Sequence, residues 1–193
     1  MNFVLKRLIT EEEYLQGELY SEIKHELIDG EAYAMAGASK NHERIIVNLS
    51  ASLHRHLQGS SCEAFSSDIK LKVGRDFFYP DLMVVCHDET ENEYYTESPA
   101  ILVEVLSKST RRLDETIKRS LYQTIPSLQE YVLIEQDFVD IEVCRRNQGW
   151  QPNHYFLGDV FVLEAIGLEV SVMEIYRRVK NDDVLSYLLA PSE

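Results

Sequence analysis

The chain has 193 residues, of which 45% are apolar and 27% are charged. This length supports one hydrophobic core and is short for two ordinary domains, and the composition excludes disordered and collagen-like chains, so we expect a single domain over residues 1–193. The net charge of -14 argues against a general affinity for polyanions, so any nucleic-acid contact must rely on a local basic patch, on bound cations or on a partner.

The first third of the chain is predicted to form a short helix, a hairpin and a long helix. Thr10 and Glu13 have the spacing of a capping box at a helix start. The pair Asp29-Gly30 separates two strand-like pieces, which predicts a tight hairpin. Residues 40–58 carry the apolar stripe of an amphipathic helix, namely Ile45, Ile46, Leu49, Leu53 and Leu57.

The middle of the chain is predicted to consist mainly of short strands. Short strands are predicted at 69–73, 77–79 and 82–86, and the segment 87–97 is predicted to be an exposed acidic loop. Later in the chain, an alternating pattern over 139–156 predicts a hairpin around Asn147-Gln148-Gly149. Helices are expected at 171–179 and 182–189.

Two further segments, 101–106 and 131–135, are apolar enough to be strands covered on both faces. Apolar residues repeat every four positions between them and Pro126 then ends the pattern, which predicts a connecting helix: Leu113, Ile117, Leu121 and Ile125. The sequence therefore predicts a βαβ unit, and with it an α/β fold.

Glu104 is the most informative single residue, because it is the only charged residue in the strand 101–106. A buried carboxylate is costly unless it binds a cation or is fully hydrogen-bonded; the alternative is an edge position turned to solvent. Asp81 stands at the head of another apolar strand, directly after Tyr79-Pro80. If the two strands are neighbours, the carboxylates of Asp81 and Glu104 meet and form oxygen ligands suited to Mg²⁺ or Mn²⁺.

A polar stripe lies beside the apolar stripe of the predicted connecting helix. Asp114, Lys118 and Tyr122 are spaced by four residues and therefore share one helix face. Considered by spacing alone, this is most simply a surface Asp–Lys pair that contributes about 0.3 kcal/mol.

The order of these motifs resembles a bacterial family of restriction-endonuclease-like proteins, abundant in cyanobacteria, within the PD-(D/E)xK nuclease superfamily. The resemblance covers nearly the whole chain. It is carried by Glu26-Leu27-Ile28-Asp29-Gly30-Glu31, Asn41-His42, Tyr79-Pro80-Asp81-Leu82, Leu102-Val103-Glu104-Val105-Leu106-Ser107, Asp114, Lys118, Tyr122 and Ile125-Pro126-Ser127-Leu128-Gln129-Glu130-Tyr131.

The resemblance implies a mixed sheet flanked by helices, with a metal site at one end. Asp81 and Glu104 match the two motif acids as metal ligands, and Glu26 matches a third acid. The superfamily lysine normally lies two residues after the second acid, where this chain has Leu106, so the resemblance implies that Lys118 replaces it. Three further residues are supporting candidates: His42, Asp114 and Tyr122.

These residues together predict a Mg²⁺- or Mn²⁺-dependent endonuclease that hydrolyses phosphodiester bonds in DNA, and the analogy extends to a homodimer. Two alternatives remain open from the sequence. One is a non-catalytic or regulatory protein that keeps the nuclease fold, and the other is an enzyme acting on RNA or a small phosphodiester. Three basic pairs are candidate phosphate contacts: Arg111-Arg112, Arg145-Arg146 and Arg177-Arg178.

Cysteine usage and apolar runs bear on the location of the protein. Cys62, Cys86 and Cys144 are odd in number and far apart, which favours buried thiols over a disulfide framework or a zinc site. The N-terminus lacks the apolar core of a secretion signal, and no apolar run approaches the ~20 residues of a membrane span. We therefore expect a soluble cytoplasmic protein without a membrane partner.

Overall fold

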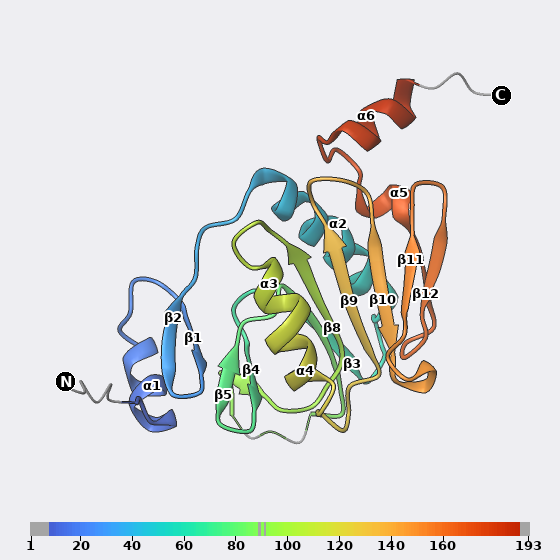
Figure 1. The fold of residues 1–193 in the computed structure, drawn as a ribbon. Coiled ribbons are helices and arrows are strands. Elements are labelled where there is room, and N and C mark those ends of the chain that lie inside the picture. The colour runs from blue at the N-terminus through green and yellow to red at the C-terminus, as the bar shows by residue number, and fades with distance from the viewer. Residues whose placement is uncertain (1–7, 89, 91, 190–193) are drawn as a thin grey trace.

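The computed structural model describes residues 8–88, 90 and 92–189. Its centre is a six-stranded sheet in which the β8–β9 pair is parallel and the other pairs are antiparallel (Figure 1). The strands are, in spatial order, β11 (Pro152–Tyr155), β10 (Ile141–Arg145), β9 (Glu130–Glu135), β8 (Pro99–Leu106), β6 (Leu82–Cys86) and β3 (Cys62–Ser66). The prediction of a mixed sheet flanked by helices is confirmed.

A second, five-stranded sheet lies on the N-terminal side of the first (Figure 1). Its order is β2 (Glu31–Ala34), β1 (His25–Ile28), β5 (Asp76–Phe78), β4 (Lys70–Val73) and β7 (Tyr95–Thr96). The predicted hairpin is confirmed as β1–β2, with Asp29 and Gly30 both at positive φ, as its tight turn requires. Helix α1 (Glu11–Glu18) begins with the predicted Thr10–Glu13 capping box.

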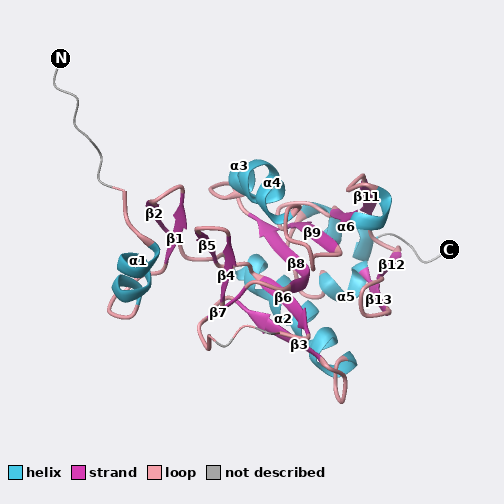
Figure 2. Cartoon of the chain, turned by 90° about the horizontal axis from the view of Figure 1, so that it is seen from below, coloured by secondary structure: helices cyan, strands magenta, loops and turns pink. Residues whose placement is uncertain are grey.

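Helices cover both faces of the six-stranded sheet. Helix α2 (Lys40–His56) packs on one face, and α3 (Arg111–Leu113), η1 (Asp114–Lys118) and α4 (Arg119–Tyr122) run along the other (Figures 1 and 2). Side chains alternate along a strand, so Ile101, Val103 and Val105 face α2, and Leu102 and Leu106 face the opposite side. Glu104 shares the parity of Leu102 and therefore faces η1.

The helix predicted between the strands 101–106 and 131–135 is present, but the choice of its buried face was wrong. Ile117 is 46% exposed, whereas Asp114, Lys118 and Tyr122 are at most 3% exposed. The polar stripe is thus buried along its whole length, whereas the apolar stripe is buried at Ile125 and only partly buried at Leu113 and Leu121. Burial of the polar stripe is possible because the Lys118 ammonium pairs with Glu26 on β1, with Glu104 on β8 and with Asp114, and because η1 is π-helical rather than α-helical.

The C-terminal part contains strands that the sequence pattern did not reveal. The predicted hairpin over 139–156 is confirmed as β10–β11, with the 3₁₀ turn η2 (Arg146–Gln148) before Gly149 at positive φ. The hairpin β12 (Val160–Leu163) and β13 (Leu168–Ser171) was not predicted, and it includes Ser171. The helix expected at 171–179 is only the short α5 (Val172–Ile175), which a turn follows. Helix α6 (Asp182–Leu189) matches its prediction.

The predicted acidic loop 87–97 also needs a correction. It contains β7, which pairs in parallel with β4, and Thr96 is buried. Glu89 and Glu91, two of the acids in this loop, lie outside the described residues, as do residues 1–7 on which the expectation of no secretion signal depends. In the described part of the chain, every helix is too short or too polar to cross a membrane.

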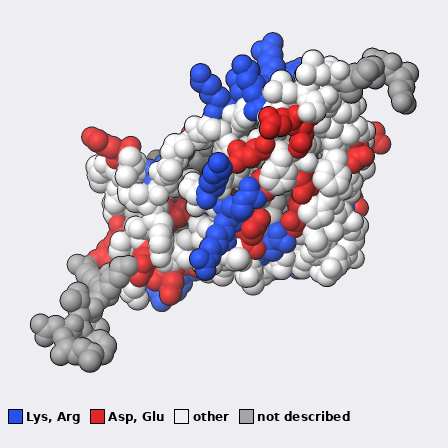
Figure 3. All heavy atoms as spheres, turned by 45° about the horizontal axis from the view of Figure 1, so that its top comes forward, with Lys and Arg blue, Asp and Glu red and all other residues white. Residues whose placement is uncertain are grey.

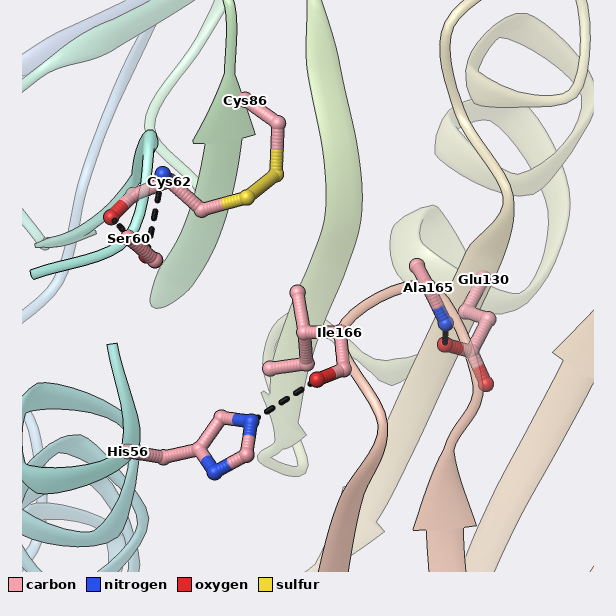
Figure 4. The surroundings of a disulfide bond; sticks show 7 residues. All are labelled: His56, Ser60, Cys62, Cys86, Glu130, Ala165 and Ile166. Carbon is pink, nitrogen blue, oxygen red and sulfur yellow. Dashed lines mark hydrogen bonds between the residues drawn. A yellow bond between two sulfur atoms is a disulfide. The ribbon is translucent and has the colours of Figure 1, made fainter.

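The cysteine prediction was wrong for two of the three residues. Cys62 and Cys86 form a disulfide that joins the edge strand β3 to β6 (Figure 4). They are directly opposite each other in the antiparallel register, a relationship hidden in the sequence because β3 was not recognised as a strand. Cys144 is a buried free thiol, as predicted. The disulfide removes the argument for a reducing compartment that rested on free thiols.

Candidate active site

Glu104 lies near the carboxyl end of β8 and is 3% exposed, so the alternative of a solvent-facing edge position was wrong. Its Oε1 accepts hydrogen bonds from Lys118 Nζ at 3.1 Å and from the Tyr122 hydroxyl at 3.0 Å. Both donors come from the helical segment that covers this face of the sheet. The buried carboxylate is therefore fixed in position by two donors on one helix face.

Lys118 is 3% exposed and its ammonium group lies among three carboxylates. Nζ is 3.1 Å from Glu104 Oε1, 3.0 Å from Glu26 Oε1 and 3.2 Å from Asp114 Oδ1. Burial alone would lower the pKa of Lys118, but these acids outweigh it and hold the pKa well above its usual range. The interpretation as an exposed surface pair was therefore wrong, and Lys118 is a buried cation that links β1, β8 and η1.

Asp81 precedes β6, and the β6–β8 pairing brings it beside Glu104, as predicted. The backbone N–H of Val105 donates to Asp81 Oδ2 at 2.7 Å, and the backbone N–H of Asp81 donates to Glu104 Oε2 at 3.4 Å. The Asp81 side chain is 18% exposed, against 4% for that of Glu104. Asp81 thus forms the more open side of the cluster, where an external group could approach.

His42 reaches the same carboxylate from the opposite face of the sheet. It lies in the first turn of α2, whose N-cap is Ser39, and its Nε2 is 3.2 Å from Asp81 Oδ2. Burial alone would lower the pKa of His42, but the hydrogen bond and the charge of Asp81 outweigh it and raise the pKa. Among the described residues Nδ1 has no hydrogen-bond partner although it is buried. The supporting position proposed for His42 from the sequence is thus beside Asp81.

The π-helical geometry of η1 explains how the polar stripe stays buried. The backbone N–H of Arg119 donates to the carbonyl of Asp114, five residues earlier. In a regular α-helix, residues four apart drift by about 40° around the axis, so a stripe of three would drift by about 80°. The wider turn offsets this drift, which allows Asp114, Lys118 and Tyr122 all to face the sheet.

Two aromatic rings and several backbone groups complete the site, and sequence reasoning missed them. The ring of Tyr122 makes edge contacts with Phe78 and Tyr131, and the Tyr131 hydroxyl donates to the Asp114 carbonyl at 3.1 Å. The backbone N–H of Tyr79 donates to Glu26 Oε1 at 3.1 Å. Backbone donors carry no signal in a sequence, whereas the tyrosine at 131 could have been found from the apolar strand that holds its ring.

Negative charge exceeds positive charge within this cluster. Four carboxylates, those of Glu26, Asp81, Glu104 and Asp114, face the single ammonium of Lys118, with His42 at the edge. Burial raises the pKa of Glu104 well above its usual range, and the neighbouring acids raise it further against the opposing effect of Lys118. Burial likewise raises the pKa of Asp114. An added cation would relieve this repulsion.

The donor set fits a divalent cation that keeps several water ligands. Among the described residues, no three His, Cys, Asp or Glu side chains converge closely enough to form a complete protein-only metal site. Mg²⁺ is commonly held by one or two carboxylates, with water and substrate phosphates as its other ligands. Asp81 and Glu104 supply such a pair of carboxylates, because the Asp81 N–H reaches Glu104 Oε2, the oxygen of Glu104 that does not contact Lys118. The contacts of Glu26 are with Lys118 and with the Tyr79 backbone.

Comparisons with known proteins show the family to which the chain belongs. The profile of the Uma2 family, described as "Putative restriction endonuclease", matches residues 11–173. Two uncharacterized proteins of the cyanobacterium Synechocystis, slr1290 and sll1609, are 39% and 40% identical, each over 88% of this chain and over 92% and 96% of their own lengths.

A solved structure from Anabaena variabilis, titled "a putative nuclease belonging to DUF820", shares the fold. Its TM-score is 0.70 at 18% identity, over 87% of this chain and 97% of that one. The range of the profile match includes every candidate residue from Glu26 to Tyr122, and the Synechocystis relatives align over most of the chain. The chain belongs to the Uma2 family of restriction-endonuclease-like proteins.

Proposed function

We propose that the protein is a metal-dependent endonuclease that hydrolyses phosphodiester bonds in DNA. The observation that carries the proposal is the convergence of Asp81, Glu104 and Lys118 at one end of the sheet, with Val105 N–H fixing one acid and Tyr122 fixing the other. Membership of a family described as restriction endonucleases and a neighbour titled as a nuclease support the same chemistry.

Asp81 and Glu104 would hold Mg²⁺ or Mn²⁺, which when bound would lower the pKa of a water ligand and neutralise charge on the phosphate. The residues of the chain have separate roles in this proposal. The acids around Lys118 hold its pKa well above its usual range, so it acts as a fixed positive charge near the reacting phosphate rather than as a base. Glu26 and Asp114 hold Lys118 in place.

His42 has a positioning role in this proposal. Its Nε2–H donates to the Asp81 oxygen that also accepts from Val105 N–H, so one donor from α2 and one from the backbone of β8 orient that carboxylate. A carboxylate with one oxygen held in this way presents its other oxygen to a ligand. This arrangement resembles the orienting contacts that surround metal ligands in general.

The test is cleavage of supercoiled plasmid and of a labelled DNA duplex with Mg²⁺ or Mn²⁺, with chelator as the control. We expect nicking and linear product with wild type, and loss of both products in Asp81→Asn and Glu104→Gln. A matched control is Glu142→Gln, which changes a partly exposed acid paired with Arg119 away from the site. Equal cleavage by wild type and both site variants would disprove the assignment.

A second candidate function is a non-catalytic protein that keeps the nuclease fold. It is favoured by one observation, that Lys118 is held by three carboxylates at 3.0–3.2 Å. Calorimetric titration with Mn²⁺ separates the two functions, because the catalytic function requires Mn²⁺ binding that is lost in Asp81→Asn.

The homodimer and the cytoplasmic location remain predictions. Light scattering after gel filtration can check the homodimer, and cell fractionation can check the location.

A further inference from the structure

Seventeen of the 19 lysines and arginines lie in the described part of the chain, and fewer than half of these form an ion pair with an acid. Ion pairs with Asp or Glu occupy seven of them: Lys24, Lys72, Arg75, Arg111, Lys118, Arg119 and Arg145. Five others lie together on two adjoining segments and, within the described part of the chain, form no ion pair: Lys40, Arg44, Arg177, Arg178 and Lys180. We call these five residues the basic ridge. All are exposed except Arg44, which is half-buried.

Hydrogen bonds hold the two segments of the basic ridge together. The Asn41 side chain donates to the carbonyl of Lys180 at 2.7 Å and accepts from the Lys180 N–H at 3.0 Å. Further along α2, the Asn48 side chain donates to the carbonyl of Arg177 at 2.9 Å. The turn 177–180 is therefore fixed along α2, and the basic side chains that project from both segments form one surface.

The basic ridge adjoins the candidate active site. Lys40 and Arg44 lie two residues on either side of His42, and the rotation of about 100° per residue turns them away from the face that carries His42. They are thus about one helix diameter, ~10 Å, from the His42–Asp81 contact. In Figure 3, where the top of Figure 1 comes forward, Lys and Arg side chains project together from the upper edge of the molecule.

We propose that the basic ridge binds the phosphate backbone of DNA beside the cleavage site. This inference rests on the proposed function. Unpaired cations are costly to keep together unless an anion joins them, and the two segments, 40–48 and 172–180, carry five basic but only two acidic side chains. The basic ridge gives a protein of net charge -14 a local surface whose side chains can displace the counterions of DNA phosphates. With five basic side chains, this surface can contact more than one phosphate.

The ridge therefore assigns an extended nucleic acid as the substrate, in preference to a small phosphodiester. Each lysine or arginine that neutralises one phosphate contributes about 0.9 to the slope of log affinity against log salt on duplex DNA. The slope thus counts the contacts that the ridge supplies. It can be measured without cleavage, in buffer that contains no divalent cation.

The experiment measures binding to a fluorescein-labelled DNA duplex by anisotropy over a range of KCl concentrations. We expect Lys40→Gln/Lys180→Gln to reduce the salt slope by about 2 relative to wild type. The control, Arg55→Gln/Arg75→Gln, makes the same charge change at exposed positions outside the ridge and should keep the wild-type slope. Equal reductions in both variants would overturn the proposal, as would binding of the ridge to anionic lipid vesicles but not to DNA.

A second measurement separates this proposal from the proposed function. In cleavage assays with Mg²⁺, the ridge variant should raise KM for the duplex and leave the rate with bis(p-nitrophenyl) phosphate unchanged. Salt-sensitive DNA binding through the ridge, with no cleavage under any condition, would support the ridge and refute the nuclease. Cleavage together with the same salt slope in wild type and in the ridge variant would support the nuclease function and refute DNA binding by the basic ridge.

Discussion

The Lys118 ammonium lies 3.1 Å from Glu104 Oε1, and both groups are almost completely buried between the sheet and the helical segment that follows β8. Two further carboxylates, those of Glu26 and Asp114, contact the same ammonium. The pair is therefore part of a charge cluster in which the acids are in excess. The stability of the protein and its proposed chemistry depend on the same few atoms.

Lys118→Met should destabilise the fold severely. Removal of the ammonium leaves three buried carboxylates without their cation, and breaking a buried pair of this kind typically costs about 3–5 kcal/mol. Urea denaturation of the two proteins measures the difference. Arg119→Met, which removes a half-buried charge from the next position, should cost much less. A Lys118→Met protein as stable as wild type would mean that the acids around Lys118 are already protonated.

Glu104→Gln should abolish cleavage without loss of stability. The glutamine oxygen can still accept from Lys118 and Tyr122, and the substitution removes one of the mutually repelling carboxylates. The amide NH2 takes the place of Oε2 and loses only the long 3.4 Å hydrogen bond from the Asp81 N–H. Thermal unfolding without metal should give a Tm equal to or above that of wild type. Functional sites often carry such a stability cost. A large fall in Tm would show instead that the Glu104 charge is needed for folding.

The stability of the metal-free protein should depend on pH through Glu104. Burial raises the folded-state pKa of this carboxyl, so the folded protein holds the proton more tightly than the unfolded chain. The resulting stabilisation is fully present below the ordinary Glu pKa of about 4.3 and is lost as pH rises through the folded-state value. The unfolding free energy of wild type minus that of Glu104→Gln should therefore become more negative as pH rises, and a constant difference would refute the assignment.

Loss of the Cys62–Cys86 disulfide should lower Tm. The bond closes a chain segment with a sequence separation of 24, and the loop-entropy relation gives roughly 3.5 kcal/mol for a loop of this size. The comparison is between wild type and Cys62→Ser/Cys86→Ser, with Cys144→Ser as the single-thiol control. Peptide mapping without reductant should recover the linked peptides. Recovery of only free thiols would contradict the bond.

Much of the fold and the heart of the site could be predicted from the sequence. The Asp29-Gly30 turn, the α2 stripe and the two apolar strands each follow a local rule, and the cost of burying Glu104 was itself the signal for a site. Asp81 could be placed beside Glu104 once β6 and β8 were taken as neighbours. These inferences depend on short-range patterns or on one pairing.

The remainder depends on contacts between distant segments. The spacing of Asp114 and Lys118 favours an exposed ion pair between them. The sequence around Lys118 contains no sign that Glu26 and Glu104 contact it from the sheet. Residues Cys62–Ser66 alternate too weakly to be recognised as an edge strand, which hid the disulfide. The buried polar face of η1 reverses the usual rule that apolar stripes face inward, and only a three-dimensional charge balance explains it.

The wide turn of η1 has a consequence for how this helix tolerates changes in length. Deleting one residue within Asp114–Lys118 would allow an ordinary α-helical turn to form and would leave Asp114 and Tyr122 seven residues apart, only about 20° out of phase at about 100° per residue. Adding one residue would instead turn Tyr122 by about a further 100° away from Glu104. The segment should therefore tolerate substitutions at its exposed positions, such as Ile117, and the loss of one residue better than the gain of one.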